Sequence, residues 1–466
     1  MDIALAATSP EPHLLPHTTH TVEVNSLLPA TTCTPSTKGH TNDKATILEV
    51  VHKHGPCSIL HKSSKTSTTK SDDKYHAQIL KQDEARVNSI HSRLNYRIHD
   101  PFTQSAAATT LPAKSGLPLG TGNYLVTLAL GTPAKQLSLV FDTGSDLTWT
   151  QCRPCLRSCY TQSEPIFDPS LSASYKNLSC TSATCTQLSS AGIQHGCSSA
   201  SSSCLYRIRR VLLHRGLAKE KLTLTSMDVF EGFLFGCGQD NEGLFNGTAG
   251  LLGLGRNNIS LVEQTAMKYN RFFSYCLPST SSSTGHLTFG NGGGSANGVK
   301  FTKLTTLSER ASSFYGLGLT GISVGGRQLP VASSVFSSSG TIIDSGTVIT
   351  RLPATAYTAL RDAFREGMKN YTMTMPFSLL DTCYNFSGNE TVSFPDIAFG
   401  FADGVTVDLD AAGILLAVSD SQVCLAFAGN KNDRDFGIIG NVQQKRLEVV
   451  YDVAGGKVGF APASCP

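Results

Sequence analysis

Several features are scarce in this 466-residue chain, and each shortage excludes a class of protein. Only 16% of the residues are charged, and 38 Lys and Arg against 35 Asp and Glu leave a net charge of +3. We therefore expect no nucleic acid partner, because phosphate backbones are bound by basic surfaces. No apolar run approaches the ~18 residues of a membrane span, so we expect none. With 42 Gly and 20 Pro, the composition predicts a turn-rich globular protein, not a coiled coil or a disordered chain.

The N-terminus lacks a recognisable signal peptide. Residues 1–20 contain Asp2, Glu11 and three prolines, and no basic start precedes an apolar stretch. The chain nevertheless has 14 cysteines, a number typical of a disulfide framework formed in an oxidising compartment. We expect a secreted or vacuolar protein whose true N-terminus is missing or whose route is unconventional. The candidate disulfide cysteines are Cys152, Cys155, Cys159, Cys180, Cys185, Cys197, Cys204, Cys237, Cys276, Cys383, Cys424 and Cys465.

A zinc site is the competing interpretation of these cysteines. Cys152, Cys155 and Cys159 resemble half of such a site. No second Cys-x-x-Cys or His-x-His follows at ligand spacing, so we predict no metal and no cofactor.

The body of the chain, from about Gly120, predicts a mostly β protein. Residues 354–371 are the clearest amphipathic helix, with an apolar face every three to four residues. The serine-rich segments 198–203 and 279–298 are expected to be surface loops. The expected strands include residues 124–130, 137–141, 233–236 and 341–343.

The body also repeats itself. An apolar run leads into Asp142-Thr-Gly-Ser145, and a second leads into Asp344-Ser-Gly-Thr347. An apolar pair with glycine follows each motif, at residues 251–253 and 438–440. The repeat predicts two related lobes that each contribute one aspartate. We assign residues 1–115 to a leader and pro-segment, 116–303 to an N-terminal lobe with a Cys-rich insert, and 304–466 to a C-terminal lobe.

A lone Asp-Thr-Gly is more often a turn than a site, but a doubled motif is far more specific. Two adjacent carboxylates do not both ionise readily, so Asp142 and Asp344 would share a proton, one acting as base and the other as acid on a water molecule. Gly144 and Gly346 would let the backbone approach the pair. The hydroxyls expected to donate to the carboxylates are those of Thr143, Ser145, Ser345 and Thr347.

These motifs resemble the pepsin-like aspartic proteases, the standard example of a shared proton, and more closely their plant nepenthesin-like branch. The resemblance covers about residues 120–466 and rests on segments 141–149, 152–204, 235–238, 250–255, 343–347 and 437–441. It implies a mainly β, bilobal pepsin-like fold with a cleft between the lobes, and an endopeptidase acting on protein or peptide substrates at acidic pH. It implies a monomer in the apoplast or vacuole. Trp149 is expected near the cleft, although a core position is equally compatible.

The leader resembles the pro-segment of that family, at His54-Gly-Pro-Cys57 and in the helix over residues 83–94. Residues 46–51 are expected to form a strand, and residues 75–97 have the period of an amphipathic helix. The leader would thus be a partner of its own enzyme. Ten of the 13 histidines precede residue 100, which suggests that acid releases the leader by charging it. Alternatively, they are scattered in a disordered segment and have no role. They are His13, His17, His20, His40, His52, His54, His61, His76, His91 and His99.

The sequence departs from the family where a flap hairpin is expected. After Tyr206 the segment contains Arg207, Arg209, Arg210, His214 and Arg215, and it has no glycine before Gly216. The family's flap turn and its tyrosine are therefore missing. A solvated basic loop and a reading-frame artefact both remain open interpretations. The alternative function is therefore a catalytically weak pepsin-fold protein that binds a protein or inhibits a glycosidase. The candidate glycosylation sites are Asn177, Asn246, Asn258, Asn370, Asn385 and Asn389.

Overall fold

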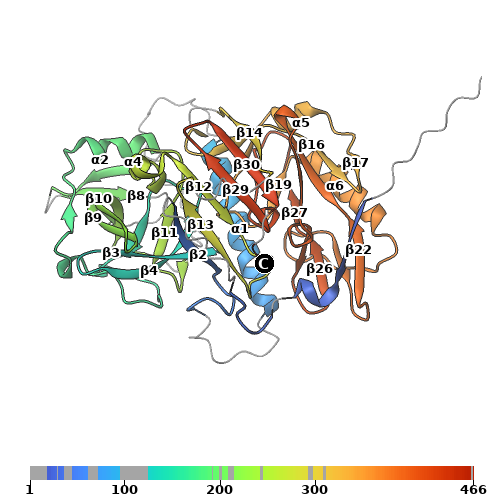
Figure 1. The fold of residues 1–466 in the computed structure, drawn as a ribbon, viewed down its shortest axis with the longest axis horizontal. Coiled ribbons are helices and arrows are strands. Elements are labelled where there is room, and N and C mark those ends of the chain that lie inside the picture. The colour runs from blue at the N-terminus through green and yellow to red at the C-terminus, as the bar shows by residue number, and fades with distance from the viewer. Residues whose placement is uncertain are drawn as a thin grey trace, which may run out of the picture.

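The computed structural model describes residues 18–28, 30–35, 45–60, 72–94, 124–191, 193–198, 202–207, 215–241, 245–291, 298–307, 311–462 and 465. Two β lobes lie side by side, and helix α1 (Asp72–Leu94) lies between them (Figure 1). The bilobal, mainly β architecture predicted from the repeat is confirmed.

The first lobe is built on strands that continue into the first aspartate motif. Strand β3 pairs antiparallel with β4 from Leu125↔Val140 to Leu130↔Lys135, and β4 lies parallel to β11. The long strands β9 and β10 form the hairpin that covers them. The elements are β3 (Tyr124–Leu130), β4 (Lys135–Asp142), β5 (Trp149–Gln151), β6 (Lys176–Asn177), α2 (Ala183–Gln187), β7 (Gln194–Cys197), β8 (Cys204–Arg207), β9 (Arg215–Thr225), β10 (Asp228–Gly238), β11 (Gly250–Gly253), α3 (Leu261–Gln264) and α4 (Ala266–Tyr269).

The second lobe repeats the parallel pair. Strand β18 lies parallel to β28, as β4 does to β11, and two four-stranded sheets in the orders β17-β16-β23-β24 and β20-β21-β26-β25 complete the lobe. The predicted helix over 354–371 is α6, which ends at Gly367 and buries Leu360 and Phe364. The elements are β15 (Tyr315–Leu317), β16 (Leu319–Val324), β17 (Arg327–Gln328), α5 (Ser333–Ser337), β18 (Thr341–Ile343), β19 (Thr350–Leu352), α6 (Ala354–Gly367), β20 (Met373–Thr374), β21 (Cys383–Asn385), β22 (Thr391–Pro395), β23 (Ile397–Phe401), β24 (Thr406–Asp408), α7 (Ala411–Ile414), β25 (Leu415–Ala417), β26 (Gln422–Leu425), β27 (Phe427–Gly429) and β28 (Gly437–Ile439).

An antiparallel sheet joins the lobes, and the leader supplies one of its strands. Strand β2 (Thr46–His52) pairs with β13 (Thr284–Phe289), and the sheet continues through β12 (Phe272–Cys276), β29 (Leu447–Asp452), β30 (Lys457–Pro462) and β14 (Lys300–Thr305). One expectation needs correction, because the segment 279–298 is not all loop and has β13 at its centre. The leader contributes to the core, where Leu48 and Val50 are buried.

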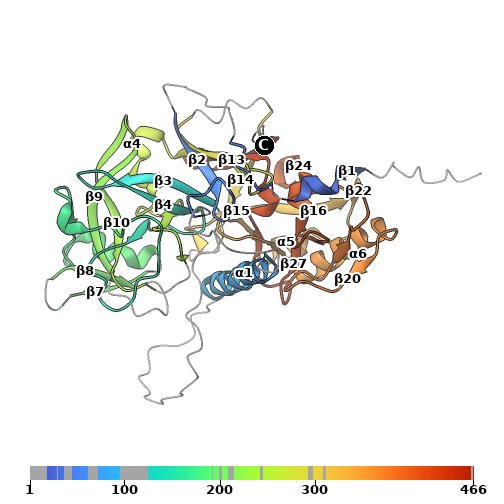
Figure 2. The ribbon, with the colours of Figure 1, turned by 90° about the horizontal axis from the view of Figure 1, so that it is seen from below.

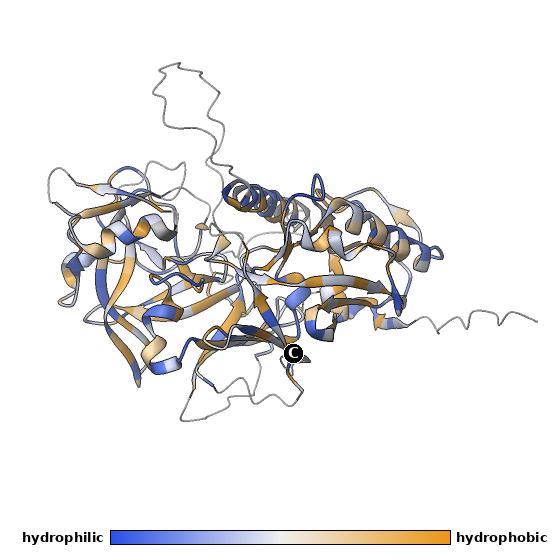
Figure 3. Cartoon of the chain, turned by 90° about the horizontal axis from the view of Figure 1, so that it is seen from above, coloured by the Kyte–Doolittle hydropathy of each residue, from blue (hydrophilic) through white to orange (hydrophobic). Residues whose placement is uncertain are grey.

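The leader contacts the centre of the molecule and the outer side of the second lobe. Its strand β1 (Thr19–Glu23) pairs with β22 at the far side of the second lobe, and α1 lies against the central strands (Figures 1 and 2). Helix α1 buries Leu80, Val87, Ile90 and Leu94, although many of its other residues are hydrophilic (Figure 3). Burial of these apolar side chains helps to hold the helix against the body of the protein.

The 14 cysteines form seven disulfides, which confirms the predicted framework. The zinc interpretation is wrong, because its three cysteines are all in disulfides. Cys33–Cys57 adds a pair inside the leader that was not among the candidates. The pairs are Cys33–Cys57, Cys152–Cys237, Cys155–Cys159, Cys180–Cys197, Cys185–Cys204, Cys276–Cys465 and Cys383–Cys424. Among the described residues, no helix is long and apolar enough to cross a membrane.

Candidate active site

Matching loops bring the two aspartates together. Asp142 ends β4, and its carbonyl accepts from the Leu254 N–H at 2.9 Å, just after β11. Asp344 follows β18, and its own N–H donates to the Ile439 carbonyl at 3.0 Å. The apolar pair with glycine that the sequence repeats is thus the parallel strand beside each aspartate loop. The two motifs meet at the junction of the lobes.

The loops are also bonded to each other across the junction. The Thr143 N–H donates to the Ser345 hydroxyl at 3.1 Å, and the Ser345 N–H donates to the Thr143 hydroxyl at 2.9 Å. This reciprocal pair corrects the expected roles of these two residues, whose side chains hold the loops together and do not donate to the carboxylates. Both are fully buried, so the bonds fix the relative position of the aspartates.

The other two hydroxyls do lie on the carboxylates. Thr347 donates to Asp344 Oδ2 at 2.6 Å, and Ser145 donates to Asp142 Oδ2. The Gly144 and Gly346 N–H groups donate to the Oδ1 atom of Asp142 and Asp344 at 2.9 and 3.0 Å. Each glycine also abuts the opposite aspartate. A Cβ at residue 346 would lie 2.3 Å from Asp142 Oδ1, and one at residue 144 would lie 2.7 Å from Asp344 Oδ1.

A guanidinium from the leader lies between the two carboxylates. Arg86 of α1 donates through Nη2 to Asp142 Oδ1 at 2.6 Å and to Asp344 Oδ2 at 2.9 Å. Its Nη1 lies 3.1 Å from Asp142 Oδ2, and its Nε lies 3.1 Å from Asp344 Oδ2. The exposed fractions of Arg86, Asp142 and Asp344 are 4%, 1% and 0%. The cation therefore lies between the two carboxylates and contacts both.

A second ion pair fixes α1 one turn before Arg86. Asp83 Oδ1 accepts from the Val348 N–H at 2.6 Å, and its Oδ2 accepts from the Ile349 N–H at 3.2 Å. The Oδ2 atom also lies 3.0 Å from Nη2 of Arg351, on strand β19. Asp83 is 0% exposed.

Sequence reasoning missed Arg86 and Asp83, although a signal was present. They lie seven and four residues after Ile79, a spacing that places them on the same helical face as the apolar residues. Charged residues on a buried face require partners, because an isolated buried charge is costly. That face of the predicted helix therefore pointed to oppositely charged groups on the body of the protein.

The surroundings of the two aspartates shift their pKa values in opposite directions. Burial and the negative charge of Asp344 raise the pKa of Asp142, although Arg86 opposes them. Burial also acts to raise the pKa of Asp344, but Arg86 and the Thr347 hydroxyl outweigh it and lower that pKa below the ordinary value. Burial disfavours the charge on Arg86, yet the two carboxylates raise its pKa. The guanidinium therefore stays charged at any pH that the protein tolerates.

Several leader histidines are less basic than free histidine. Burial, aided by Lys445, lowers the pKa of His52 to about 3. Burial likewise lowers the pKa of His54 and of His91, whose Nε2 lies 2.9 Å from the Phe436 carbonyl oxygen. The assumption that these histidines charge near their reference pKa of ~6.5 is wrong. His13, His17, His40, His61 and His99 lie outside the described residues.

The remaining predicted residues lie away from the aspartates. Trp149 is buried, and its ring packs edge-on against Phe245 at 4.8 Å. All six candidate glycosylation asparagines are exposed. Within the atypical flap segment, residues 208–214 lie outside the described residues.

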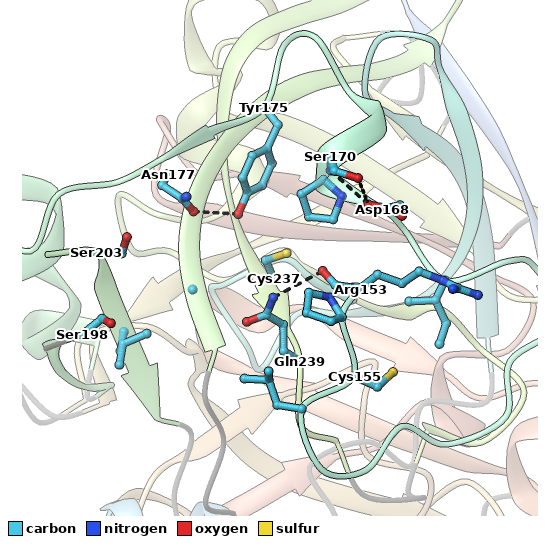
Figure 4. Close-up of a pocket in the computed structure, with 16 residues that line it drawn as sticks. Arg153, Cys155, Asp168, Ser170, Tyr175, Asn177, Ser198, Ser203, Cys237 and Gln239 are labelled. Carbon is cyan, nitrogen blue, oxygen red and sulfur yellow. Dashed lines mark hydrogen bonds between the residues drawn. The ribbon is translucent and has the colours of Figure 1, made fainter. Parts of the chain in front are cut away.

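One cavity lies away from the aspartates. It has a volume of about 870 Å³ and lies between the Cys-rich insert and β8 to β10 (Figure 4). Figure 4 shows Asn177 accepting from the Tyr175 hydroxyl at 2.9 Å, beside Asp168 and Ser170 on the neighbouring turn. No charged cluster like that at Asp142 is among the residues that line it.

Comparisons with known proteins agree with this geometry. Residues 124–291 match the family described as Xylanase inhibitor N-terminal, and residues 314–462 match Xylanase inhibitor C-terminal. An aspartyl protease family protein of Arabidopsis thaliana is 53% identical over 96% of this chain and 93% of its own. Aspartic proteinase nepenthesin-2 of Nepenthes gracilis is 36% identical, over 83% and 85% of the two chains.

Solved structures agree on the fold. The crystal structure of edgp covers 75% of this chain and 93% of its own, with a TM-score of 0.58 at 20% identity. Basic 7S globulin from soybean covers 73% and 91%, with a TM-score of 0.57 at the same identity. The fold is therefore the pepsin-like bilobal fold, and the chain belongs to the plant pepsin-like aspartyl protease family, which includes the nepenthesins.

Proposed function

We propose that the chain is an aspartic endopeptidase in which Asp142 and Asp344 activate water to hydrolyse peptide bonds at acidic pH. The observation that carries the proposal is the pair of buried carboxylates held by matching loops and bonded to one cation. Once that cation leaves, like charges this close would retain one proton between them. The ionised aspartate then takes a proton from water, while the protonated one hydrogen-bonds the peptide carbonyl.

We further propose that the leader is a pro-segment and that the chain is made as a zymogen. Arg86 occupies both carboxylates, so substrate has no access to them while α1 is in place. Release of α1 is then a requirement for activity, and the leader would be cut afterwards. The disulfide framework and the family of the chain suit a secreted or vacuolar protein whose substrates are proteins or peptides.

The test is peptide cleavage by the full chain after acid treatment, at about pH 3 to 5. Asp142→Asn and Asp344→Asn should each abolish cleavage while the protein remains folded, because each removes one member of the acid-base pair at nearly constant volume. The matched control is Asp362→Asn, an exposed aspartate on α6. Full activity in either dyad variant would overturn the shared-proton mechanism.

The second candidate is a pepsin-fold protein that binds a protein partner or inhibits a glycosidase with weak catalysis. The altered flap sequence over residues 206–216 favours it, as does the description of the matching families as xylanase inhibitors. A folded, acid-treated chain that inhibits a xylanase and cleaves no peptide would select this function.

A further inference from the structure

The carboxylate of Asp83 lies in a binding site that belongs to the second lobe. Its two oxygens accept from the backbone amides of Val348 and Ile349, and Arg351 lies 3.0 Å away. The two amides and the guanidinium come from the segment that follows Asp344, and only the carboxylate comes from the leader. Two hydrogen-bonding backbone amides and an ion-paired guanidinium together suit one carboxylate.

Arg351 is held in position independently of the leader. Its Nη1 donates to the Ile349 carbonyl at 2.7 Å, within its own strand segment, and the residue is 4% exposed. When α1 departs, the guanidinium and the two amides lose the carboxylate of Asp83, and water or a substrate carboxylate can take its place.

The position of this site relative to the dyad suits a peptide substrate. Asp83 and Arg86 are three residues apart on one helix, which separates them by about 4.5 Å along the axis. An extended peptide advances about 3.3 Å per residue. The site therefore lies about one or two residues from a scissile bond bound at Asp142 and Asp344.

There is also room for a side chain beside Arg351. A cavity of about 330 Å³ lies next to it and is lined by Tyr357, Asp381 and Asn430 of the second lobe and by Glu84 of α1. Among the described residues that line it, Arg351 carries the one positive charge. Asp381 does not compete for it, because Asp381 accepts from the Tyr357 hydroxyl and pairs with Arg361 and Arg365.

We infer that Arg351, with the amides of Val348 and Ile349, forms a specificity subsite for an acidic substrate side chain close to the scissile bond. This inference rests on the proposed peptidase function. In the structure, the Asp83 carboxylate occupies the position of that acidic substrate side chain, and the Arg86 guanidinium occupies the position of the scissile peptide bond at Asp142 and Asp344.

The experiment uses the acid-activated full chain and paired peptides that carry Glu or Gln at one position at a time around the scissile bond. At pH ~5.5, one position should favour Glu in kcat/KM by about tenfold or more, the effect of a hydrogen bond to a charged group. The preference should fade toward pH ~3, because the Glu side chain is protonated below its reference pKa of ~4.3. This test needs no variant.

Variants then assign the preference to Arg351. Arg351→Gln should equalise the Glu and Gln peptides, Arg351→Lys should retain part of the preference, and Arg327→Gln, at an exposed arginine on β17, should retain all of it. Non-cleavable isosteres of the same peptides, measured as ligands, give the binding preference without turnover. If the Arg351 variants do not fold, the pH dependence in the unaltered chain decides.

The outcomes separate the subsite from the peptidase function. Cleavage with no Glu preference at any position would overturn the subsite and leave the function intact. Glu-selective binding without cleavage of any peptide would support the subsite and overturn the function. A preference that persists in Arg351→Gln would show that another group recognises the carboxylate and would overturn the assignment.

Discussion

Replacement of Arg86 by Gln should loosen α1 from the body of the protein. The guanidinium is buried and bonds both carboxylates, at distances from 2.6 to 3.1 Å. Removal of one partner from a buried ion pair costs about 3 to 5 kcal/mol, because the opposite charge stays behind without compensation. Since 1.36 kcal/mol is a factor of ten, the opening equilibrium of α1 should rise by about two to nearly four orders of magnitude near pH 7.

The size of this effect should depend on pH, because Asp142 and Asp344 can take up a proton when Arg86 is absent. Without Arg86, the two carboxylates share a proton in its place, and each pH unit of acidification favours that proton uptake by about 1.4 kcal/mol. The difference between Arg86→Gln and the unaltered chain should therefore shrink as the pH falls. In the unaltered chain, the lowered pKa of Asp344 stabilises the docked helix above ~3.8, and that stability is lost as the pH falls through the folded value.

Amide hydrogen exchange of α1, over residues 72–94, measures this opening directly. The matched control is Lys81→Gln, which removes a positive charge from an exposed position on the same helix. The reasoning would be refuted if Arg86→Gln and Lys81→Gln left α1 equally protected at pH 7. It would also be refuted if the effect of Arg86→Gln grew on acidification.

Two further predictions concern the loops and the leader. Gly346→Ala should lower kcat by about a hundredfold without unfolding the protein, because the added Cβ would lie 2.3 Å from Asp142 Oδ1 and displace that carboxylate. The control is Gly196→Ala, whose Cβ meets nothing within 4 Å and which should leave kcat unchanged in the same peptide assay. His52→Gln should lower the pH at which the leader is released, measured by its cleavage. A histidine whose pKa is lowered to about 3 stabilises the docked leader above ~6.5 and loses that stability as the pH falls toward 3, whereas Gln does not titrate. An unchanged release midpoint, equal to that of the exposed control His195→Gln, would exclude His52 as the trigger.

The structure changes the explanation, expected from the sequence, that acid releases the leader by charging its histidines. The histidine effect does not come from repulsion between charged histidines, because burial keeps His52, His54 and His91 uncharged in the docked leader. Acid instead favours the released state, in which these side chains can take up protons. Asp83 acts in the opposite direction, because burial raises its pKa and its protonated form is tolerated in the docked helix. The histidines and Asp344 thus favour release on acidification, whereas Asp83 and Asp142, whose pKa values are raised in the docked state, resist it.

The sequence by itself determined the architecture and the central pair of residues. A doubled Asp-[Thr/Ser]-Gly motif, each copy preceded by an apolar strand, requires two similar units, and their aspartates are Asp142 and Asp344. The disulfide framework also followed from composition. These features can be predicted because strand periodicity and turn motifs are patterns of consecutive residues.

Only the tertiary structure decided how the leader and the loops are used. The exchange of bonds between Thr143 and Ser345 joins residues 202 positions apart, and the contact of Arg86 with Asp344 spans 258. Strand β13 was missed because it lies in a segment rich in serine and glycine and contains Gly285, a residue type that is depleted in strands; pairing on both edges with β2 and β12 overrides that local signal. The pairing of charged residues that are this far apart in the sequence depends on how the lobes and α1 pack, and no local sequence pattern specifies that pairing.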